Sequence, residues 1–421
     1  MVKTLSLSPG VTLRCFRDNR FKQGRLSIQF VRPMCLEEAS MNALLPAVLL
    51  RGTEKHPDLR SITQYLDDLY GSSVGDLVRR IGDYHTTGLY CAFTEDSFAL
   101  PGDEILAPTV AFLEEILFES VTEKGLLCRS FVESERKNLL ADLQAQKNDK
   151  ALYSANRLMA TMCRGDSYGI PRLGTAKTIS AITPETLTAH YRKVLTESPV
   201  EIFYVGSLPA EEMARLLTPL ARRLGKDADE LPEQTAFRGD EETHQREGLE
   251  IAQSRINLGF VTPITNRDEG FAAMQVFNAL FGSGMTSKLF MTVREKMSLC
   301  YSISSGYYGT KGILPVAAGI DGKKETVVRE EILRQLALCR DGEISDAELE
   351  GARQSLLTGL QGVHDSPGAI ENYYATAALS GLNRTPEVYR QQVLAVTRED
   401  VVAAAKSLKL QASFFLEGLC N

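Results

Sequence analysis

The chain has 421 residues, of which 43% are hydrophobic and 24% are charged, and its formal net charge at pH 7 is −7. At roughly 100–200 residues per domain this length predicts two or three domains, and the composition is typical of a soluble globular protein. The acidic balance argues against nucleic acid as a partner, because a surface that binds phosphate must be basic.

Neither a leader nor a membrane segment is expected. Residues 1–6 lack the continuous apolar core of a signal peptide, and the longest mostly apolar run, 41–50, is far shorter than the roughly 20 residues that cross a bilayer. The cysteines include no Cys-x-x-Cys pair, which argues against a zinc ribbon or a thioredoxin-like redox centre. We predict reduced, mostly buried thiols in a cytoplasmic protein of a bacterium.

The first half of the chain carries both strand and helix patterns. Residues 26–31 alternate between apolar and polar side chains, which is typical of a strand, and the apolar run 200–206 predicts another. Thr183 is a good N-cap, and Pro184 suits the first helical position after it. A helix that ends at Gly71 is predicted from four apolar residues on one face, namely Leu59, Ile62, Leu66 and Leu69.

The second half repeats this order. Strands are expected at 256–260 and 413–418, and a helix between them has three apolar residues on one face, namely Leu289, Val293 and Met297. Residues 393–401 match the apolar pattern of residues 179–187. Thr397 is the matching N-cap, and Asp400 stands where a capping box requires an acid. A duplicated domain is the simplest explanation.

A charged stretch separates the two halves. Residues 226–250 are rich in acidic side chains and poor in apolar ones, which predicts an exposed linker. The expected domains are therefore residues 1–225 and 251–421, joined by residues 226–250. Because helices and strands alternate in both, each domain is expected to be α+β, with helices packed on a sheet.

The most specific motif lies in the second half. A Gly-rich turn that contains Gly282, Ser283 and Gly284 precedes a helix that carries Arg294, and Tyr301 follows seven residues later. The stretch is similar to the C-terminal domain of the M16 family of zinc metallopeptidases, which includes insulinase, pitrilysin and mitochondrial processing peptidase. The resemblance implies that these five residues bind substrate, since an Arg and a Tyr at this spacing hold the peptide in that family. Without the surrounding match, the pair reads as a solvated arginine and a half-buried tyrosine.

The resemblance also implies a fold and a metal site. The fold is two similar α+β domains, each a mixed, mostly antiparallel sheet with helices on it, which face each other across a cavity. The metal site is His-x-x-Glu-His on a helix, followed shortly by Gly-Thr. Counting back from Gly52-Thr53, the two histidines fall on Ala43 and Ala47 and the glutamate falls on Pro46. All three functional groups are lost, and Pro46 is expected to disturb the interior of a helix.

The third zinc ligand of the family is also altered. It is a glutamate seven residues after Glu-Arg, and here Glu135-Arg136 leads to Asp142. A relocated zinc site would need the remaining histidines, and no two of them share a metal-binding spacing; they are His56, His85, His190, His244 and His364. No Gly-x-Ser-x-Gly elbow, Walker-type loop or dinucleotide fingerprint is present. We predict neither a cofactor nor independent catalysis.

Several functions fit these observations. In paired members of the family one chain supplies zinc while the other supplies the Arg/Tyr pair, which predicts the substrate-positioning subunit of a heterodimeric zinc protease. Its partners would be a peptide or unfolded polypeptide and a zinc-bearing homologue, with a homodimer as the form without that homologue. The alternatives are a structural scaffold, as in respiratory complexes, and a separate peptide-binding or chaperone-like module. Motif-lacking members of Gram-positive bacteria suggest a further alternative, a role in elongation factor P modification.

Overall fold

The framework of the molecule is a pair of β-sheets with helices packed on each. The computed structural model describes residues 2–239 and 241–419, so that Cys420 and Asp240 lie outside the described residues. The chain divides into two units. Unit 1 comprises Met1–Gln144, Ile170–Glu233 and His364–Thr376, and unit 2 comprises Ala145–Gly169, Gln234–Val363 and Ala377–Asn421. Both units are therefore built from discontinuous segments, whereas the predicted domains follow the chain without interruption.

Unit 1 contains a six-stranded sheet in the order β1-β2-β8-β3-β5-β4. Its strands are β1 (Val2–Ser8), β2 (Val11–Arg17), β3 (Gln23–Pro33), β4 (Ser73–Ile81), β5 (Tyr84–Thr94) and β8 (Val200–Gly206). Only the β2–β8 pair is parallel, so the sheet is mixed and mostly antiparallel, as predicted. The strands predicted at 26–31 and 200–206 are confirmed as β3 and β8. A small hairpin, β6 (Thr122–Glu123) with β7 (Leu126–Leu127), lies apart from this sheet.

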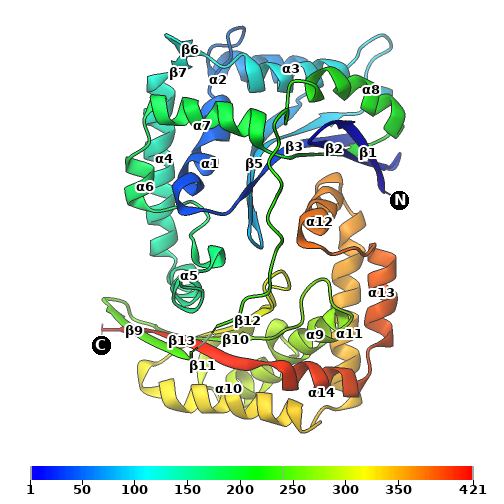
Figure 1. Ribbon diagram of the computed structural model, residues 1–421. Helices are drawn as coiled ribbons and strands as arrows, with labels where there is room; N and C mark the ends of the chain where they lie inside the picture. Colours follow the sequence, from blue (N-terminus) through cyan, green and yellow to red (C-terminus); the bar gives the residue numbers. More distant parts are fainter. Residues whose placement is uncertain (1, 240, 420–421) are drawn as a thin grey trace. The chain divides into compact units, whose positions relative to one another are not determined.

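Helices cover the sheet of unit 1 (Figure 1). They are α1 (Leu36–Leu49), α2 (Leu59–Asp68), α3 (Leu106–Phe118), α4 (Arg129–Asn148), α6 (Ala176–Ser180), α7 (Pro184–Glu197) and α8 (Ala210–Ala221). Thr183 caps α7 by accepting from the Thr186 N–H, and Pro184 is its first residue, as predicted. The predicted face of α2 is partly wrong. Ile62 and Leu66 are buried, but Leu59 is 49% exposed because it lies in the first turn, which projects beyond the core.

Unit 2 contains a five-stranded sheet in the order β11-β12-β10-β13-β9. Its strands are β9 (Thr243–Leu249), β10 (Ser254–Val261), β11 (Cys300–Ser305), β12 (Ile313–Ile320) and β13 (Lys409–Gly418). Only β9 and β13 run parallel. The strands predicted at 256–260 and 413–418 are confirmed as parts of β10 and β13. Strand β9 falls inside the stretch predicted to be a linker, where polar side chains alternate along an edge strand.

The helices of unit 2 include two short π-helices beside the Gly-rich turn, η3 (Ala279–Ser283) and η4 (Phe290–Lys296). The remaining α-helices are α5 (Lys150–Met162), α9 (Phe271–Asn278), α10 (Glu325–Arg340), α11 (Asp346–Gln361), α12 (Pro367–Ser380), α13 (Pro386–Ala395) and α14 (Arg398–Ser407). Helix α12 crosses the boundary between the units at residue 376. Thr397 and Asp400 form the predicted capping box of α14.

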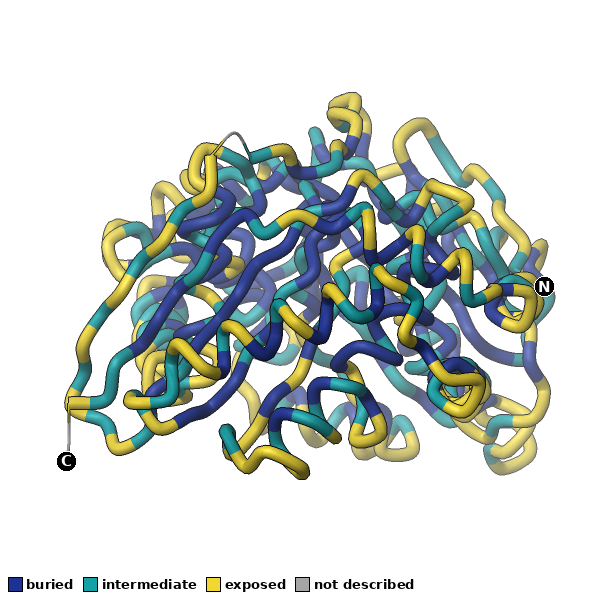
Figure 2. The backbone as a smooth tube through the Cα atoms, turned by 90° about the horizontal axis from the view of Figure 1, so that it is seen from below, coloured by how far each residue is buried: buried dark blue, intermediate teal, exposed yellow. Residues whose placement is uncertain are grey.

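Burial follows the strands in both units. Buried residues run along the strands and the inner faces of the helices, and exposed residues occupy the outer faces and loops (Figure 2). In the part of the chain that the structure describes, no helix combines the length and apolar character needed to span a membrane.

Candidate functional site

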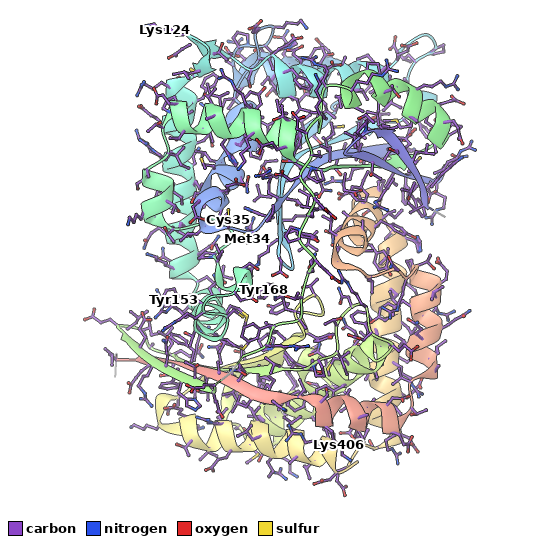
Figure 3. All side chains as sticks on the ribbon, viewed as in Figure 1. Met34, Cys35, Lys124, Tyr153, Tyr168 and Lys406 are labelled. Carbon is purple, nitrogen blue, oxygen red and sulfur yellow. The ribbon has the colours of Figure 1, made fainter. Side chains whose placement is uncertain are left out.

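Helix α1 carries the positions that correspond to the family's metal motif. It begins after Cys35 (Figure 3), and Ala43 and Pro46 are buried in its second half while Ala47 is partly buried. A methyl group and a pyrrolidine ring offer no nitrogen or oxygen to a metal. The described residues elsewhere hold no group of three or more His, Cys, Asp or Glu side chains arranged to bind one. The donor set of this chain therefore does not fit the family's zinc ion.

Pro46 leaves α1 unbroken, which corrects the expectation that it would disturb the helix. Proline has no N–H, so the carbonyl of Asn42, four residues earlier, lacks its helical donor. The Thr87 hydroxyl of β5 donates to that carbonyl at 2.7 Å. Beyond the proline the helix resumes, with the Leu50 N–H bonded to the Pro46 carbonyl at 3.0 Å. A side chain from the sheet thus supplies the missing hydrogen bond.

A buried hydrogen-bonded chain lies beside the lost metal positions. The Nε2 of His190 bonds the Oδ1 of Asn42 at 2.8 Å, and the Nδ2 of Asn42 lies 3.3 Å from Nδ1 of His85. The three residues are at most 4% exposed. Burial lowers the pKa of His85 to about 3 and that of His190 to about 4. Both rings are therefore neutral at pH 7, with His190 donating to Asn42 and Asn42 donating to His85.

The sequence analysis did not predict this hydrogen-bonded network, because Asn42, His85 and His190 come from three separate elements, α1, β5 and α7. The histidine spacing gives no signal, since three strands and several helices separate the three positions. An asparagine directly before the first lost histidine position is the one clue that the sequence offers.

The other proposed metal-site residues have separate surroundings. Asp142 is exposed on α4. Glu135 accepts from Arg51 at 3.1 Å and from Asn138 at 3.0 Å. These bonds make Glu135 a structural ion-pair partner rather than a ligand.

The Gly-Thr anchor belongs to a second buried cluster. The Thr53 hydroxyl donates to Glu115, and Nδ1 of His56 lies 2.8 Å from the same carboxylate. Although burial raises the pKa of Glu115, these hydrogen bonds outweigh it and hold the pKa below its usual value. Gly52 is required here, because a Cβ would lie 2.6 Å from the Pro57 carbonyl oxygen. The anchor therefore fixes the loop after α1.

The glycines of the Gly-rich turn have different surroundings. Gly282 is buried, and a Cβ on it would lie 2.7 Å from Oγ of Ser305 in β11. Gly284 faces open space, and Ser283 is exposed. Gly282 thus allows η3 to approach β11 closely, whereas Ser283 and Gly284 lie at the surface.

Arg294 projects from η4 at the surface of unit 2. Its side chain is 41% exposed and lies over the ring of Phe290 at 4.6 Å. The carboxylate of Glu295 lies 3.7 Å from the guanidinium, which is beyond hydrogen-bond distance. Val293 beside it is fully buried as predicted, but Met297 is 40% exposed because the π-helical turn moves it off the buried face. Arg294 therefore has donors to offer a ligand.

Tyr301 is displayed by an irregularity of β11. The pairing of β11 with β12 shifts between Cys300 and Ser302, so Tyr301 occupies a β-bulge and is 65% exposed. Bulges re-aim side chains. Just before it, Ser298 has φ of 50°, and the Leu299 N–H donates to the Val293 carbonyl at 2.9 Å. This turn ties the start of β11 to η4, so Arg294 and Tyr301 come from two directly linked elements.

Comparisons with known proteins give one consistent result. The family model described as Peptidase M16 inactive domain matches residues 181–356. The Bacillus subtilis (strain 168) protein named "Probable inactive metalloprotease YmfF" is 27% identical over 412 residues, which are 97% of this chain and 96% of that protein.

Solved structures share the whole fold. A conserved protein from Enterococcus faecalis V583 has a TM-score of 0.92 and 30% identity, covering 100% of this chain and 99% of that chain. A structure from Pseudomonas fluorescens described as peptidase M16 inactive domain has a TM-score of 0.82 and 19% identity, covering 99% and 98%. Together with α1, where the metal ligands are replaced by Ala43, Pro46 and Ala47, these likenesses identify the chain as a member of the M16 peptidase family and an inactive homologue within it.

Proposed function

We propose that this chain is the substrate-positioning subunit of a heterodimeric zinc protease. The observation that carries the proposal is the contrast between the two functional regions. The metal positions of α1 have lost every ligand, whereas Arg294 and Tyr301 stand exposed on linked elements. In support of the proposal, the Arg294 guanidinium has no carboxylate within hydrogen-bond distance among the ion pairs of the described residues, and Tyr301 stands on a β-bulge.

The two side chains suit the main chain of a polypeptide. A guanidinium has five N–H donors and a phenol has one O–H donor, and both can bond peptide carbonyl oxygens. Holding a peptide in a fixed register next to a hydrolytic centre lowers the entropic part of the barrier. The partner chain would supply that centre, with His-x-x-Glu-His binding zinc and its glutamate acting as the base.

The expected partners are an unfolded polypeptide and a zinc-bearing homologue of the same family. We place the complex in the cytoplasm. None of the cysteines that the structure describes is joined in a disulfide, which suits a reducing compartment.

Replacing Arg294 by Ala tests the proposal. In the complex with the zinc-bearing homologue, R294A should lower peptide turnover about 10-fold or more, because a charge-assisted hydrogen bond is worth about 1.5–3 kcal/mol. The matched control is Arg398→Ala, since Arg398 has the same 41% side-chain exposure and pairs with Asp346 on a different helix. Assembly of the complex should be unaffected by either change. An unchanged rate with R294A would contradict substrate positioning and favour a scaffold.

A further inference from the structure

We propose that a bound peptide adds as a strand to the open edge of β11, and that acidic side chains on the peptide are what the site selects. This inference rests on the proposed function, because it uses the same surface as Arg294 and Tyr301. It extends that function by naming the binding mode and the class of peptide.

The edge of β11 has free main-chain groups. Among the strands that the structure describes, β11 is the outermost of its sheet, and β12 is its one neighbour there. In an antiparallel pair, alternate residues of an edge strand turn their N–H and C=O groups away from the partner strand. The Gly306 N–H donates to the Pro315 carbonyl at 3.0 Å, which sets this alternation. The main-chain groups of Ile303 and Ser305 therefore point to the open edge, where an extended peptide can pair with them.

The edge of β4 in unit 1 is sealed. Nη1 of Arg172 donates to the Val78 carbonyl of β4 at 2.8 Å. In return, Nη1 of Arg80 in β4 donates to the Ile170 carbonyl at 2.8 Å. The segment that carries these residues thus occupies hydrogen-bonding groups that an added strand would need.

The edge of β9 is protected by charge. Arg246 on β9 bonds both Glu325 and Glu417, and charged side chains on an edge oppose strand addition. β11 itself carries no charged residue and no proline. Among these three edges, β11 is the one suited to receive a strand.

Cations gather at the start of β11. Burial raises the pKa of the Cys300 thiol to about 11. The positive charges of Arg294 and Lys324 act in the opposite direction, because both lie near the thiol. Nζ of Lys324 also donates to the Ser298 carbonyl at 3.0 Å, which holds the ammonium beside the strand. Glu295, at 3.7 Å from Arg294, offsets part of this charge. A peptide carboxylate near Tyr301 would meet two cations.

Two short labelled peptides that differ only in a central Glu-x-Glu or Gln-x-Gln test the selectivity by fluorescence anisotropy. The acidic peptide should bind about 10-fold more tightly at low salt, as two surface ion pairs allow, and the preference should disappear in about 0.5 M salt. Lys324→Gln should reduce the preference to about threefold. Lys323→Gln is the matched control, because Lys323 is exposed and its ammonium makes no bond to the Ser298 turn; it should leave the preference unchanged.

Hydrogen exchange followed by NMR tests the binding mode. The peptide should slow exchange of the Ile303 and Ser305 amides and leave that of Ser304, which already faces β12, unchanged. Equal binding of both peptides, weakened by Arg294→Ala, would overturn acidic selectivity while supporting the proposed function. Binding without protection of Ile303 and Ser305 would overturn strand addition. Binding of neither peptide, to the chain or to its complex, would overturn the proposed function as well.

Discussion

Asn42 joins two buried histidines directly beside the positions that have lost the metal ligands. Its side-chain amide is bonded to His190 and His85, and its carbonyl is bonded to Thr87. A buried polar group costs free energy unless it is hydrogen-bonded. The interior beside α1 is therefore kept folded by a neutral network in which an asparagine links two histidines. We expect this network to stabilise unit 1.

Replacing Asn42 by Ala leaves the two imidazoles short of partners, whereas the Thr87 hydroxyl keeps its bond to the main-chain carbonyl of residue 42. The variant should lose about 2–4 kcal/mol of unfolding free energy, since each unsatisfied buried group costs about 1–3 kcal/mol. Asn138→Ala on the exposed side of α4 is the control and should change stability by less than about 0.5 kcal/mol. Urea unfolding measures both, and equal effects would show that the network contributes nothing.

The two histidines also predict a pH dependence. Their pKa values in the folded chain, about 3 for His85 and about 4 for His190, lie below the ordinary value of 6.5. The unfolded chain therefore binds more protons between pH 6.5 and pH 4, so stability is complete above pH 6.5 and falls as the pH decreases through this window. The loss should reach about 2.7 kcal/mol per pH unit for two sites.

His190→Gln isolates one of these sites. Urea midpoints measured from pH 6.5 to pH 4.5 should fall about half as steeply in this variant, because one of the two depressed histidines is gone. Identical slopes for the two proteins would mean that His190 titrates normally in the folded chain.

At the scale of elements, α1 depends on a contact from β5. Thr87→Val should cost about 1–3 kcal/mol, because it leaves the buried Asn42 carbonyl without a donor. In a Pro46→Ala background a backbone N–H becomes available to that carbonyl, so the same Thr87 substitution should cost about 1 kcal/mol less. Urea unfolding of the four proteins measures this coupling. Strict additivity would show that Thr87 does not compensate for the proline.

The Gly-rich turn provides a matched pair of substitutions. Gly282→Ala should destabilise the chain by about 1–3 kcal/mol, because its Cβ would lie 2.7 Å from the Ser305 hydroxyl and 2.9 Å from Leu289. Gly284→Ala should be tolerated, since Gly284 has φ of −141° and nothing within 4 Å of the added atom. Thermal unfolding distinguishes the two. Equal melting temperatures would contradict a packing role for Gly282.

Much of the element order could be predicted from the sequence, because it depends on local patterns. The N-caps at Thr183 and Thr397 and the strands β3, β8 and β10 follow from caps and alternation. Other features depend on contacts between distant residues. The Thr87 hydroxyl of β5 supplies the hydrogen bond to the Asn42 carbonyl that Pro46 cannot make. The bulge at Tyr301 depends on how β11 pairs with β12. No local pattern reports such partners.

At the scale of the whole molecule, the chain keeps the family fold while its metal ligands are gone. Its likeness to the Enterococcus faecalis structure extends over the full length, with a TM-score of 0.92. On our proposal, a complete fold without the metal site suits a subunit that works beside a catalytic homologue, and Arg294 and Tyr301 would hold the substrate.

The most direct test is to recover this chain from its own cells under native conditions, identify its partners by mass spectrometry, and measure zinc in the recovered complex. We predict a stoichiometric homologue that carries His-x-x-Glu-His, with the zinc lost when that motif is mutated and retained when Asp142 of this chain is replaced by Ala. Recovery of this chain alone, or of zinc that depends on its own residues, would contradict the assignment as a non-catalytic positioning subunit.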